Sequence, residues 1–449
     1  MNRRDVLRGL SLLPPAGLLG TLSNSGAAAD AEYRALVVVF LAGGNDGHNV
    51  LVPTDGMYTD YQAARQNLAL PRNSLIPLPG QAAGHTFGLH PALQPLVPLY
   101  GQQRLQFLAN VGPLVQPCTA AEVLSSTVEL PAFLGSHSDQ TEITQGWTVT
   151  DDTSGWAGRA LERLPTHLST RASAVAVDSM RSTLLQGQRT AVSFMTIGGI
   201  NHWGIGDLTR PDHPGTQTIS RLARWQFQND YEAEWARTFS KELTDSDYFV
   251  KVFQRAQAPQ ADFGSSQSGL PRLLSGLASA LPVFKADGLK RQVFLVQWGS
   301  FDTHANQRGN ASTTQDAQLG VLAKALAAFD ATNADNGLDR QVTTLVMSEF
   351  GRTVRPGSGG GSEHGWGNHW WVMGGSVAGG GVTGAFPSPR LGGPDDSDPG
   401  LNGRHAPTIA VDQVGATLMH WMGLDPSNFV DVFPHLANFP TKTLPLLRA

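Results

Sequence analysis

Residues 35–49 read ALVVVFLAGGNDGHN, an unbroken apolar run followed at once by a glycine-rich polar segment. Such a run is typical of a strand that is buried on both faces, as in a parallel sheet. Similar runs stand at residues 105–109, 293–296 and 342–347. We therefore predict that these segments are buried strands of one sheet.

Helical patterns lie between the predicted strands. Apolar residues recur at the spacing of one helix face within residues 319–329 and again within residues 411–421. Strands that alternate with helices predict an α/β fold with a doubly wound, mostly parallel sheet and helices on both faces. We predict a single domain at residues 30–449, in which the polar stretch 119–267 is an insertion or cap region.

The composition excludes several classes of protein. The chain has 37 acidic and 32 basic side chains, a net charge of −5, so no basic excess is present for binding nucleic acid. A hydrophobic fraction of 41% with 10 Trp is ample for a packed core, which excludes general disorder. The single cysteine, Cys118, excludes an intrachain disulfide and a Cys-based structural zinc site.

The start of the chain has the pattern of an export signal. Arg3 and Arg4 precede a mild apolar stretch at residues 10–22, and small residues follow at 27–29. This order resembles a twin-arginine signal peptide over residues 1–29. It predicts a bacterial chain that uses the twin-arginine export machinery and works in the periplasm or outside the cell. No apolar run of the mature chain approaches the length that spans a bilayer.

Acids and imidazoles come directly after the predicted strands. Asn45 and Asp46 follow the first run, Asp302 and His304 follow the third, and Glu349 follows the fourth. The carboxyl ends of parallel strands open on one crevice, so these side chains are expected to converge despite their wide separation in sequence.

The segment 363–369 adds further imidazoles behind the fourth strand. Several carboxylates and imidazoles in one pocket would repel or desolvate one another without a cation. Oxygen and nitrogen ligands without thiolates suit zinc, manganese, magnesium or calcium, so we predict one or two divalent ions. The predicted ligands are Asp46, Asp302, His304, Glu349, His364 and His369.

Each motif also has a purely structural explanation. The segment 45–47 alone is a turn signal, Glu349 can pair with Arg352, and His364 and His369 can be ordinary loop histidines. For any single motif the structural explanation is the better one, because short motifs have many false positives. Taken together the motifs favour a site, since independent turns have no reason to gather acids and imidazoles at one edge of a sheet.

At these residues the chain resembles an exported bacterial family known as domain of unknown function 1501, which is itself similar to the alkaline phosphatase and sulfatase superfamily. The resemblance spans essentially the whole mature chain. It is carried by GGNDG at 43–47, GLHP at 88–91, SHSDQ at 136–140, GWAGR at 155–159, FDTH at 301–304, SEFGRT at 348–353, the segment 364–369 and VDQ at 411–413.

The superfamily implies an alkaline phosphatase-like core with two divalent ions around a phosphate or sulfate ester and a Ser, Thr or modified Cys nucleophile. By position, Asp46 resembles the first metal-binding Asp of the superfamily. Asp302 and His304 stand where an Asp/His pair binds the other ion, and His364 or His369 stands where a late histidine completes that site.

The chain departs from this pattern in three respects. Asp302 and His304 are separated by one residue, where alkaline phosphatases separate the pair by three. Phe350 occupies the position of an expected histidine ligand, so the second ion would be poorly held or absent. No nucleophile is evident from the sequence. Thr119, at a predicted helix N-terminus where backbone amides favour an anion, is one candidate. Ser138 is the other, and His137 or Asp139 beside it could instead be ligands.

Two functions are compatible with these features. The first is an exported metal-dependent hydrolase of phosphate or sulfate esters, acting on a small-molecule ester or a carbohydrate-like substrate, with Arg352 and the aromatic wall of Trp366 beside the site. The second is a non-catalytic exported binding or assembly protein with a degenerate metal site, working with a partner protein from a neighbouring exported family. Phe350 favours the second, whereas the retained acids and imidazoles favour the first, which we predict.

Overall fold

The computed structural model describes residues 32–146, 152–179, 183–198, 212, 214–264 and 269–448. The predicted signal segment, residues 1–29, lies outside this described part of the chain. Within the described ranges, no helix combines the length and the apolar character that a membrane span requires.

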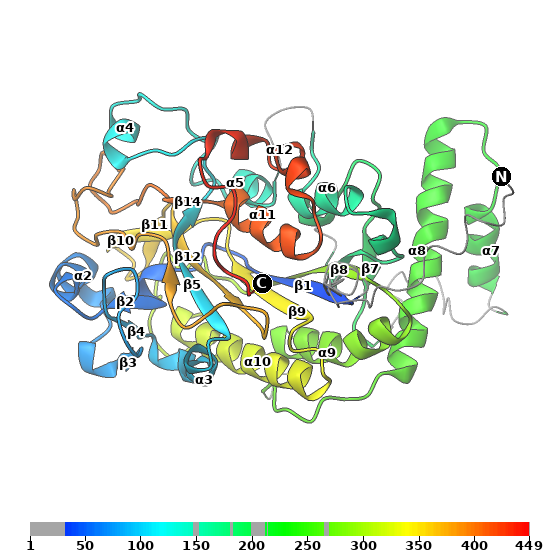
Figure 1. Cartoon of the computed structure of the whole chain (residues 1–449), viewed down its shortest axis with the longest axis horizontal. Helices are drawn as coiled ribbons and strands as arrows, with labels where there is room; N and C mark the ends of the chain where they lie inside the picture. Colours follow the sequence, from blue (N-terminus) through cyan, green and yellow to red (C-terminus); the bar gives the residue numbers. More distant parts are fainter. Residues whose placement is uncertain are drawn as a thin grey trace, which may run out of the picture. The chain divides into compact units, whose positions relative to one another are not determined.

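A mixed, mostly parallel sheet forms the centre of the fold (Figure 1). Its strands are β1 Arg34–Leu41, β5 Leu105–Gly112, β6 Ala174–Val177, β7 Ser193–Met195, β8 Arg291–Trp298, β9 Val342–Met347, β12 Asn368–Met373, β13 Val382–Thr383 and β14 Ile409–Ala410. They lie in the order β13-β5-β12-β9-β1-β8-β6-β7, with β14 also paired to β5. Strand β12 is antiparallel to its neighbours β5 and β9, and the other pairings of this sheet are parallel.

The predicted strands are confirmed, since the apolar runs form β1, β5, β8 and β9. Strand β1 lies between β8 and β9, with Val38 opposite Leu295 on one side and Leu345 on the other. These neighbours are parallel, so their carboxyl ends meet at one edge of the sheet. The polar segments that follow them are therefore brought together, as predicted.

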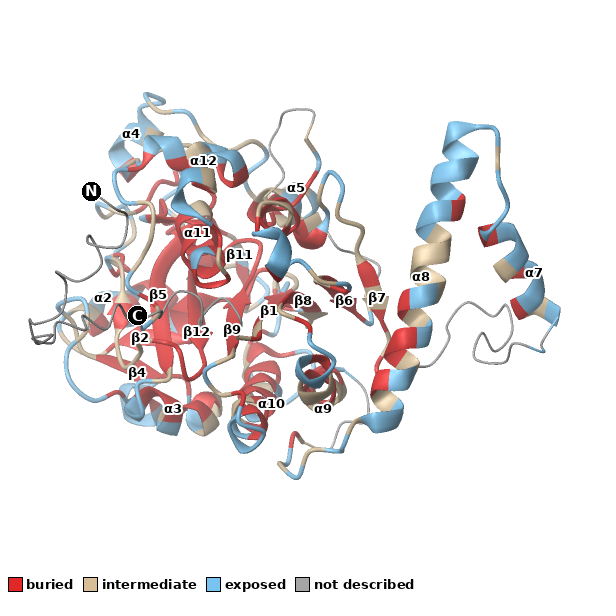
Figure 2. Cartoon of the chain, turned by 45° about the vertical axis from the view of Figure 1, so that its right-hand side comes forward, coloured by how far each residue is buried: buried red, intermediate tan, exposed pale blue. Residues whose placement is uncertain are grey.

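Helices cover both faces of the sheet (Figures 1 and 2). The helices are α2 Met57–Arg65, α3 Val97–Gly101, α4 Ala120–Leu124, α5 His137–Thr144, α6 Trp156–Glu162, α7 Pro214–Ala223, α8 Asp230–Arg255, α9 Leu270–Ala286, α10 Gln315–Asp335, α11 Val411–Trp421 and α12 Phe429–Val432. Helices α9 and α10 pack in one core cluster, and α6 and α11 pack in the other. The predicted α/β fold, with helices on both faces of a mostly parallel sheet, is confirmed. Helices α10 and α11 contain the predicted helical patterns.

The alternation of side chains along β1 explains the two clusters. Val37 and Val39 belong to the cluster of α9 and α10, whereas Leu36 and Val38 belong to the cluster of α6 and α11. Successive residues of a strand point to opposite faces, so an apolar run without polar breaks supplies both cores. The buried sheet between the partly exposed helices is visible in Figure 2.

The segment 119–267, predicted as a cap, contributes to the central sheet as well. It contains helices α4 to α8, and it also supplies β6 and β7, which extend the sheet beyond β8. Residues 216–256, which read as one long helical stretch in the sequence, form two helices, because α7 ends at Ala223 and α8 begins after Asn229. The Asn229 side chain caps α8 by accepting hydrogen bonds from the backbone amides of Tyr231 and Glu232.

The described part of the chain also contains two small sheets. One contains β10 Arg352–Pro356 and β11 Ser362–His364, which pair as antiparallel strands. The other contains β2 Leu51–Pro53, β3 Ile76–Pro77 and β4 Phe87–Leu89. Strand β10 begins a few residues after the carboxyl end of β9. Its Arg352 pairs with His364 of β11, so His364 lies near the carboxyl edge of the central sheet.

Candidate metal centre

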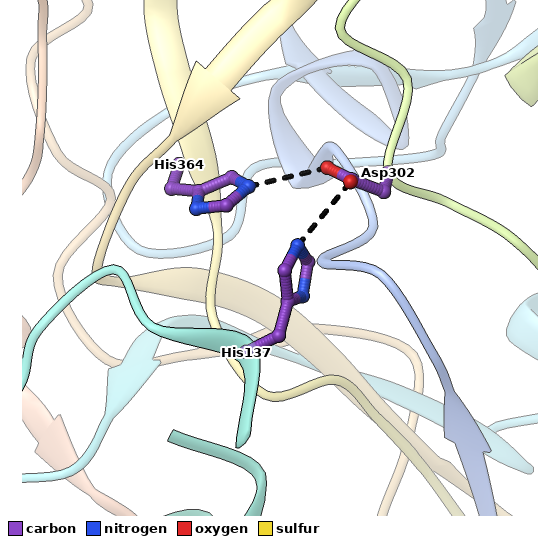
Figure 3. Close-up of side chains that lie close together, drawn as sticks. All are labelled: His137, Asp302 and His364. Atoms are coloured by element: carbon purple, nitrogen blue, oxygen red, sulfur yellow. Dashed lines mark hydrogen bonds and ion pairs between the residues drawn. The ribbon is translucent and has the colours of Figure 1, made fainter. Parts of the chain in front are cut away.

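His137, Asp302 and His364 lie close together (Figure 3). One possible ligand atom from each residue lies within 4.8 Å of the other two. His137 Nε2 is 3.3 Å from Asp302 Oδ2, and His364 Nε2 is 3.2 Å from Asp302 Oδ1. Asp302 follows β8, His137 begins α5 and His364 ends β11, so the group unites three distant parts of the chain. We call it the candidate metal centre.

Each imidazole of the centre is held by its other ring nitrogen. His364 Nδ1 lies 2.6 Å from the carbonyl oxygen of Gly135, and His137 Nδ1 lies 3.0 Å from Glu349 Oε1. These oxygens only accept, so each Nδ1 carries the hydrogen and donates it. In the neutral ring each Nε2 then presents a lone pair, which is the arrangement that metal-binding histidines use.

The spacing of these atoms fits a divalent ion. Bonds of about 2.0–2.1 Å in a tetrahedral site place neighbouring ligand atoms about 3.4 Å apart. The two imidazole nitrogens lie 3.3 and 3.2 Å from the two different oxygens of Asp302, and one ligand atom of each residue lies within 4.8 Å of the others. His137 Nε2 is also buried, and its contact is the 3.3 Å ion pair with Asp302 rather than a hydrogen bond. A cation between two imidazole nitrogens and a carboxylate would satisfy this atom, and the donor set suits zinc or manganese.

His304 lies beside the centre, in contact with both Asp302 and His364. Its Nε2 is 2.9 Å from Asp302 Oδ1 and 3.0 Å from His364 Nε2, and its Nδ1 is 2.6 Å from Glu363 Oε2. Glu363 was not among the predicted site residues. Its position next to His364 was the available signal, because carboxylates commonly orient the histidines of such sites.

Glu349, predicted as a ligand, is buried behind His137. Its Oε1 accepts a hydrogen bond of 2.7 Å from the backbone amide of Gly43, in addition to the one from His137. The hydrogen bond to Glu349 raises the pKa of His137 against the opposing effect of burial. The structure thus places Glu349 where it orients an imidazole of the centre.

Arg352 is fully buried and holds Asp302. Its Nη2 donates to Asp302 Oδ1 at 2.7 Å and to the carbonyl of Phe301 at 3.3 Å. Burial alone would raise the pKa of Asp302, but the hydrogen bond and charge of Arg352, with the charges of His304 and His137, hold that pKa below its ordinary value. Asp302 is therefore ionised at neutral pH, as a metal ligand must be.

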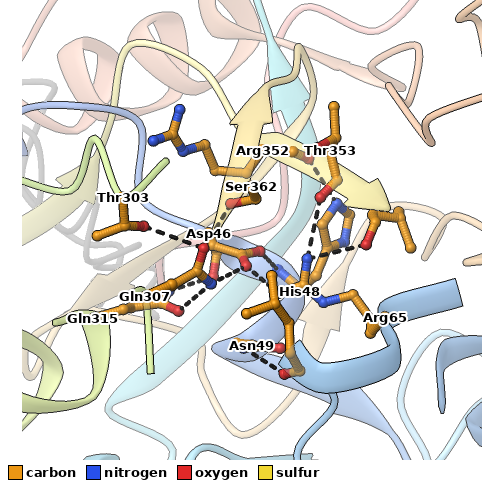
Figure 4. Close-up of polar contacts among 12 residues, drawn as sticks. Asp46, His48, Asn49, Arg65, Thr303, Gln307, Gln315, Arg352, Thr353 and Ser362 are labelled. Atoms are coloured by element: carbon orange, nitrogen blue, oxygen red, sulfur yellow. Dashed lines mark hydrogen bonds and ion pairs between the residues drawn. The ribbon is translucent and has the colours of Figure 1, made fainter. Parts of the chain in front are cut away.

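Asp46, also predicted as a ligand, lies in a separate buried network (Figure 4). Its Oδ2 forms an ion pair with Arg65 and accepts a hydrogen bond of 2.6 Å from Gln307. Its Oδ1 accepts a hydrogen bond of 3.1 Å from the backbone amide of His48. Among the described residues, Arg65 neutralises the Asp46 carboxylate. Asp46 does not belong to the group formed by His137, Asp302 and His364.

His369 lies in a cluster of buried histidines outside the candidate metal centre. Its Nδ1 accepts a hydrogen bond of 3.1 Å from the backbone amide of Asn110, and its Nε2 is buried without a partner. The ring centre of His48 is 5.8 Å from that of His369 and 5.1 Å from that of His405. Burial lowers the pKa of all three histidines, and that of His405 falls to about 4.

The two nucleophile candidates differ in position. Thr119 caps the short helix α4, where its hydroxyl donates to Glu122 Oε2 at 2.8 Å and accepts from the Glu122 amide at 3.3 Å. Ser138 lies in the first turn of α5 and lines a cavity of about 840 Å³ together with His137 and Asp302. Of the two, Ser138 shares a cavity with the candidate metal centre.

The remaining predicted residues lie around this region. Asp139 accepts hydrogen bonds from the hydroxyl of Ser136 and, at 3.4 Å, from that of Ser138. The buried indole of Trp366 donates to the carbonyl of Pro113 at 3.0 Å, and Trp366 lines a second cavity of about 690 Å³ that includes His364.

Asn45 is buried beside Asp46 rather than at the candidate metal centre. Its backbone amide donates to Ser348 Oγ at 2.9 Å, and its side-chain oxygen accepts from Gln315 Nε2 at 3.1 Å. The backbone carbonyl of Asp46 accepts a second hydrogen bond of 2.7 Å from the same Gln315 amide. These bonds fix the turn that follows β1 against the loop that follows β9 and the start of α10.

Phe350 closes one side of the candidate metal centre. Its ring centre lies 4.9 Å from that of His137 and 4.7 Å from that of His364. A β-carbon at Gly44, which has φ of +75°, would overlap the same ring, so glycine is required there for Phe350 to fit. An aromatic ring offers no ligand atom, so this side of the centre lacks donors for a second ion.

Comparison with known proteins adds a family and a set of distant structures. A family model described as "Protein of unknown function (DUF1501)" matches residues 33–435. No curated protein sequence matches the chain.

Solved structures resemble the chain at low sequence identity. The lipoteichoic acid synthase LtaP from Listeria monocytogenes is 10% identical with a TM-score of 0.33, covering 88% of this chain and 73% of that one. The zinc complex of the C-terminal periplasmic domain of EcEptC from Escherichia coli is 8% identical with a TM-score of 0.35, covering 89% and 85%. The PsFucS1 sulfatase from Pseudoalteromonas sp. is 11% identical with a TM-score of 0.33, covering 87% and 73%.

Proposed function

The chain belongs to the DUF1501 family, and we propose that it is an exported hydrolase of phosphate or sulfate esters that uses one divalent ion. The ion would be held by His137, Asp302 and His364. One observation carries the proposal: the Nε2 lone pairs of two oriented imidazoles and an ionised carboxylate meet at the spacing of metal ligands. When bound, such an ion polarises the ester and stabilises the charge that develops on its oxygens.

The residues around the centre have separate tasks in this proposal. Glu349 and Arg352 orient His137 and Asp302 through the hydrogen bonds described above. His304 Nε2 faces the centre while its Nδ1 is held by Glu363, so the neutral ring presents an Nε2 lone pair and His304 is placed to accept a proton at the centre. Ser138, in the cavity lined by His137 and Asp302, is the proposed nucleophile.

The proposal includes export because of the pattern in residues 1–29. A paired arginine, a mild apolar stretch and a small-residue segment stand there in the order of a twin-arginine signal. Such export carries chains that fold, and bind their metal, before they cross the membrane. The proposed place of action is the periplasm or the cell exterior, and replacement of both Arg3 and Arg4 by Lys, followed by cell fractionation, tests this part.

Elemental analysis of the protein, purified without chelator, tests the metal centre. We expect about one divalent ion per chain, together with hydrolysis of at least one member of a panel of phosphate monoesters, phosphate diesters and sulfate esters. Asp302→Ala should lose both the ion and the activity. The matched control is Asp55→Ala, because Asp55 is another partly exposed aspartate that pairs with a histidine, His85, at 2.7 Å.

The two parts of the proposal fail in different ways. A folded wild-type protein without any metal would overturn the metal centre. A protein with one bound ion that cleaves none of the esters would overturn the hydrolase and favour a binding role. Equal metal content in Asp302→Ala and wild type would show that the ion is bound elsewhere.

A further inference from the structure

Residues of the candidate metal centre line two cavities. The first, of about 840 Å³, includes His137 and Asp302 in its lining, and we call it the polar cavity. The second, of about 690 Å³, includes His304 and His364, and we call it the apolar-walled cavity. The residues of the centre are thus divided between two separate spaces.

The polar cavity presents several hydroxyl and amide groups besides Ser138. These side chains are Thr141, Gln145, Thr183, Gln186, Gln297 and Ser300. Hydroxyl and carboxamide groups both donate and accept hydrogen bonds. A lining of this kind suits a ligand that carries several hydroxyl groups, since each polar atom that leaves water then finds a partner.

The apolar-walled cavity has a different lining. The apolar part of its wall is formed by Val123, Leu124, Leu130, Leu134, Trp366 and Pro399. Ser126, Ser397 and the ion pair of Asp398 with Arg404 line it as well. Leu124 and Leu134 are 47% and 36% exposed, although leucine is among the residues most often buried. Apolar side chains left open at the wall of a cavity are stabilised when an apolar ligand removes them from water.

The carboxylate of Asp302 lies between these two spaces. Its Oδ2 faces His137 of the polar cavity, and its Oδ1 faces His364 of the apolar-walled cavity (Figure 3). An ester bound to the proposed ion at Asp302 can extend into both cavities only if its phosphate or sulfate group carries two organic substituents. A sulfate or phosphate monoester has one alcohol arm, whereas a phosphate diester has two.

We infer, on the basis of the proposed function, that the substrate is a phosphate diester with a hydroxyl-rich arm in the polar cavity and an apolar arm in the apolar-walled cavity. Hydrolysis breaks the bond between phosphorus and the oxygen of the apolar arm. Water supplies the hydroxyl group that phosphorus gains and, in the overall balance, the proton that the leaving oxygen takes up. The products are a phosphate monoester of the hydroxyl-rich arm and an apolar alcohol.

The leaving side follows from the cavity that holds the proposed nucleophile. Ser138 lines the polar cavity together with His137 and Asp302. In-line displacement requires the nucleophile and the leaving oxygen to lie on opposite sides of phosphorus, so attack by Ser138 expels the arm that lies in the apolar-walled cavity.

Four chromogenic esters test the inference on the metal-loaded full chain: 4-nitrophenyl glyceryl phosphate, bis(4-nitrophenyl) phosphate, 4-nitrophenyl phosphate and 4-nitrophenyl sulfate. We expect kcat/KM for the glyceryl diester to exceed that of the monoester and of the sulfate by about tenfold or more, and to exceed that of the bis-aryl diester. A monoester or a sulfate cleaved as well as the diesters would overturn the inference and leave the proposed function standing. Hydrolysis of none of the four would overturn both.

Variants in each cavity separate the two arms. Leu124→Asn and Leu134→Asn should lower kcat/KM for the glyceryl diester about tenfold with unchanged metal content, and Leu222→Asn, at a leucine 43% exposed in α7, is the matched control. Gln297→Leu should shift preference from the glyceryl diester toward the bis-aryl diester. Leucine variants as active as Leu222→Asn, or an unchanged preference in Gln297→Leu, would show that the cavities do not hold the two arms.

Discussion

The guanidinium of Arg65 forms an ion pair with Asp46 in which neither side chain has any exposed surface. A carboxylate directly after the first strand of a parallel sheet is a common place for a metal ligand, and the sequence predicted that role. In the structure Arg65, from the last turn of α2, reaches the carboxylate instead, and Gln307 supplies a further hydrogen bond of 2.6 Å. The pair joins the loop after β1 to a helix that lies outside the sheet.

Asp46→Asn is therefore expected to act on stability and not on metal content. The substitution leaves the Arg65 guanidinium buried without its carboxylate, which typically costs about 3–5 kcal/mol. Urea denaturation measures this cost, and elemental analysis measures the bound ion. A variant of normal stability that has lost its ion would contradict the structural role and restore Asp46 as a ligand.

Ser138→Ala and Thr119→Ala distinguish the two hydroxyl groups. Ser138→Ala should abolish ester hydrolysis with little change in stability, since its hydroxyl lies in the polar cavity. Thr119→Ala removes the cap of α4 and should cost about 1 kcal/mol of stability while activity is kept. Steady-state kinetics and thermal denaturation of both variants measure these effects. Loss of hydrolysis in Thr119→Ala, with hydrolysis kept in Ser138→Ala, would make Thr119 the nucleophile.

His405 is expected to make the protein acid-sensitive. Its pKa is about 4 in the folded chain because of burial, and about 6.5 when unfolded. The unfolded state therefore binds the proton more readily, so the contribution of His405 is fully present above about pH 6.5 and is lost as the pH falls toward 4. In His405→Asn the unfolding free energy should change less between pH 7 and about 4.5 than in wild type, and an identical change would contradict the prediction.

Asp412 is expected to have the opposite dependence. It lines a cavity of about 340 Å³, its Oδ2 is buried without a hydrogen-bond partner, and burial raises its pKa to about 7, although the charge of Arg159 opposes this. The folded chain keeps the proton that the unfolded chain loses near pH 4. The stabilising contribution is thus present at low pH and disappears as the pH rises to 7.

Asp412→Asn should therefore stabilise the protein in alkaline solution. At about pH 8 the gain is expected to be about 1–4 kcal/mol, because the ionised carboxylate is no longer buried, whereas near pH 4 the variant and wild type should be similar. Thermal denaturation at both pH values measures the difference. A variant that is less stable than wild type at pH 8 would show that Asp412 is ionised and paired in the folded chain.

The sequence was sufficient to place β1, β8 and β9 because each is an apolar run followed by glycine and acids. It did not reveal that the antiparallel strand β12 separates β9 from β5. Strand order depends on pairing between segments that are far apart, and an apolar run such as Trp370 to Met373 fits several places in a sheet. The sequence also did not reveal that β6 and β7 lie beside β8. Both strands are short, so their apolar runs give a weak signal.

The candidate site was predicted in part. Asp302 and His364 were proposed as ligands from the convergence of strand ends, and they lie together with His137. His137 was an alternative only, because it belongs to a helix whose approach to the sheet is set by tertiary packing. Asp46 and His369 have the right chemistry for ligands, but their partners Arg65 and Asn110 come from other elements that no local pattern identifies.

The hydrogen bond from Gly43 to Glu349 joins residues 306 positions apart, and the one from His137 to Glu349 joins residues 212 positions apart. The candidate metal centre therefore cannot form in a partly folded chain, because its orienting residues meet only when β1 and β9 have paired and α5 has docked. An ion that binds the native state alone would raise the apparent stability by about 2.7 kcal/mol at a concentration one hundred times its Kd. Ion uptake would then be a late folding event, and the bound metal would mark a fully assembled chain.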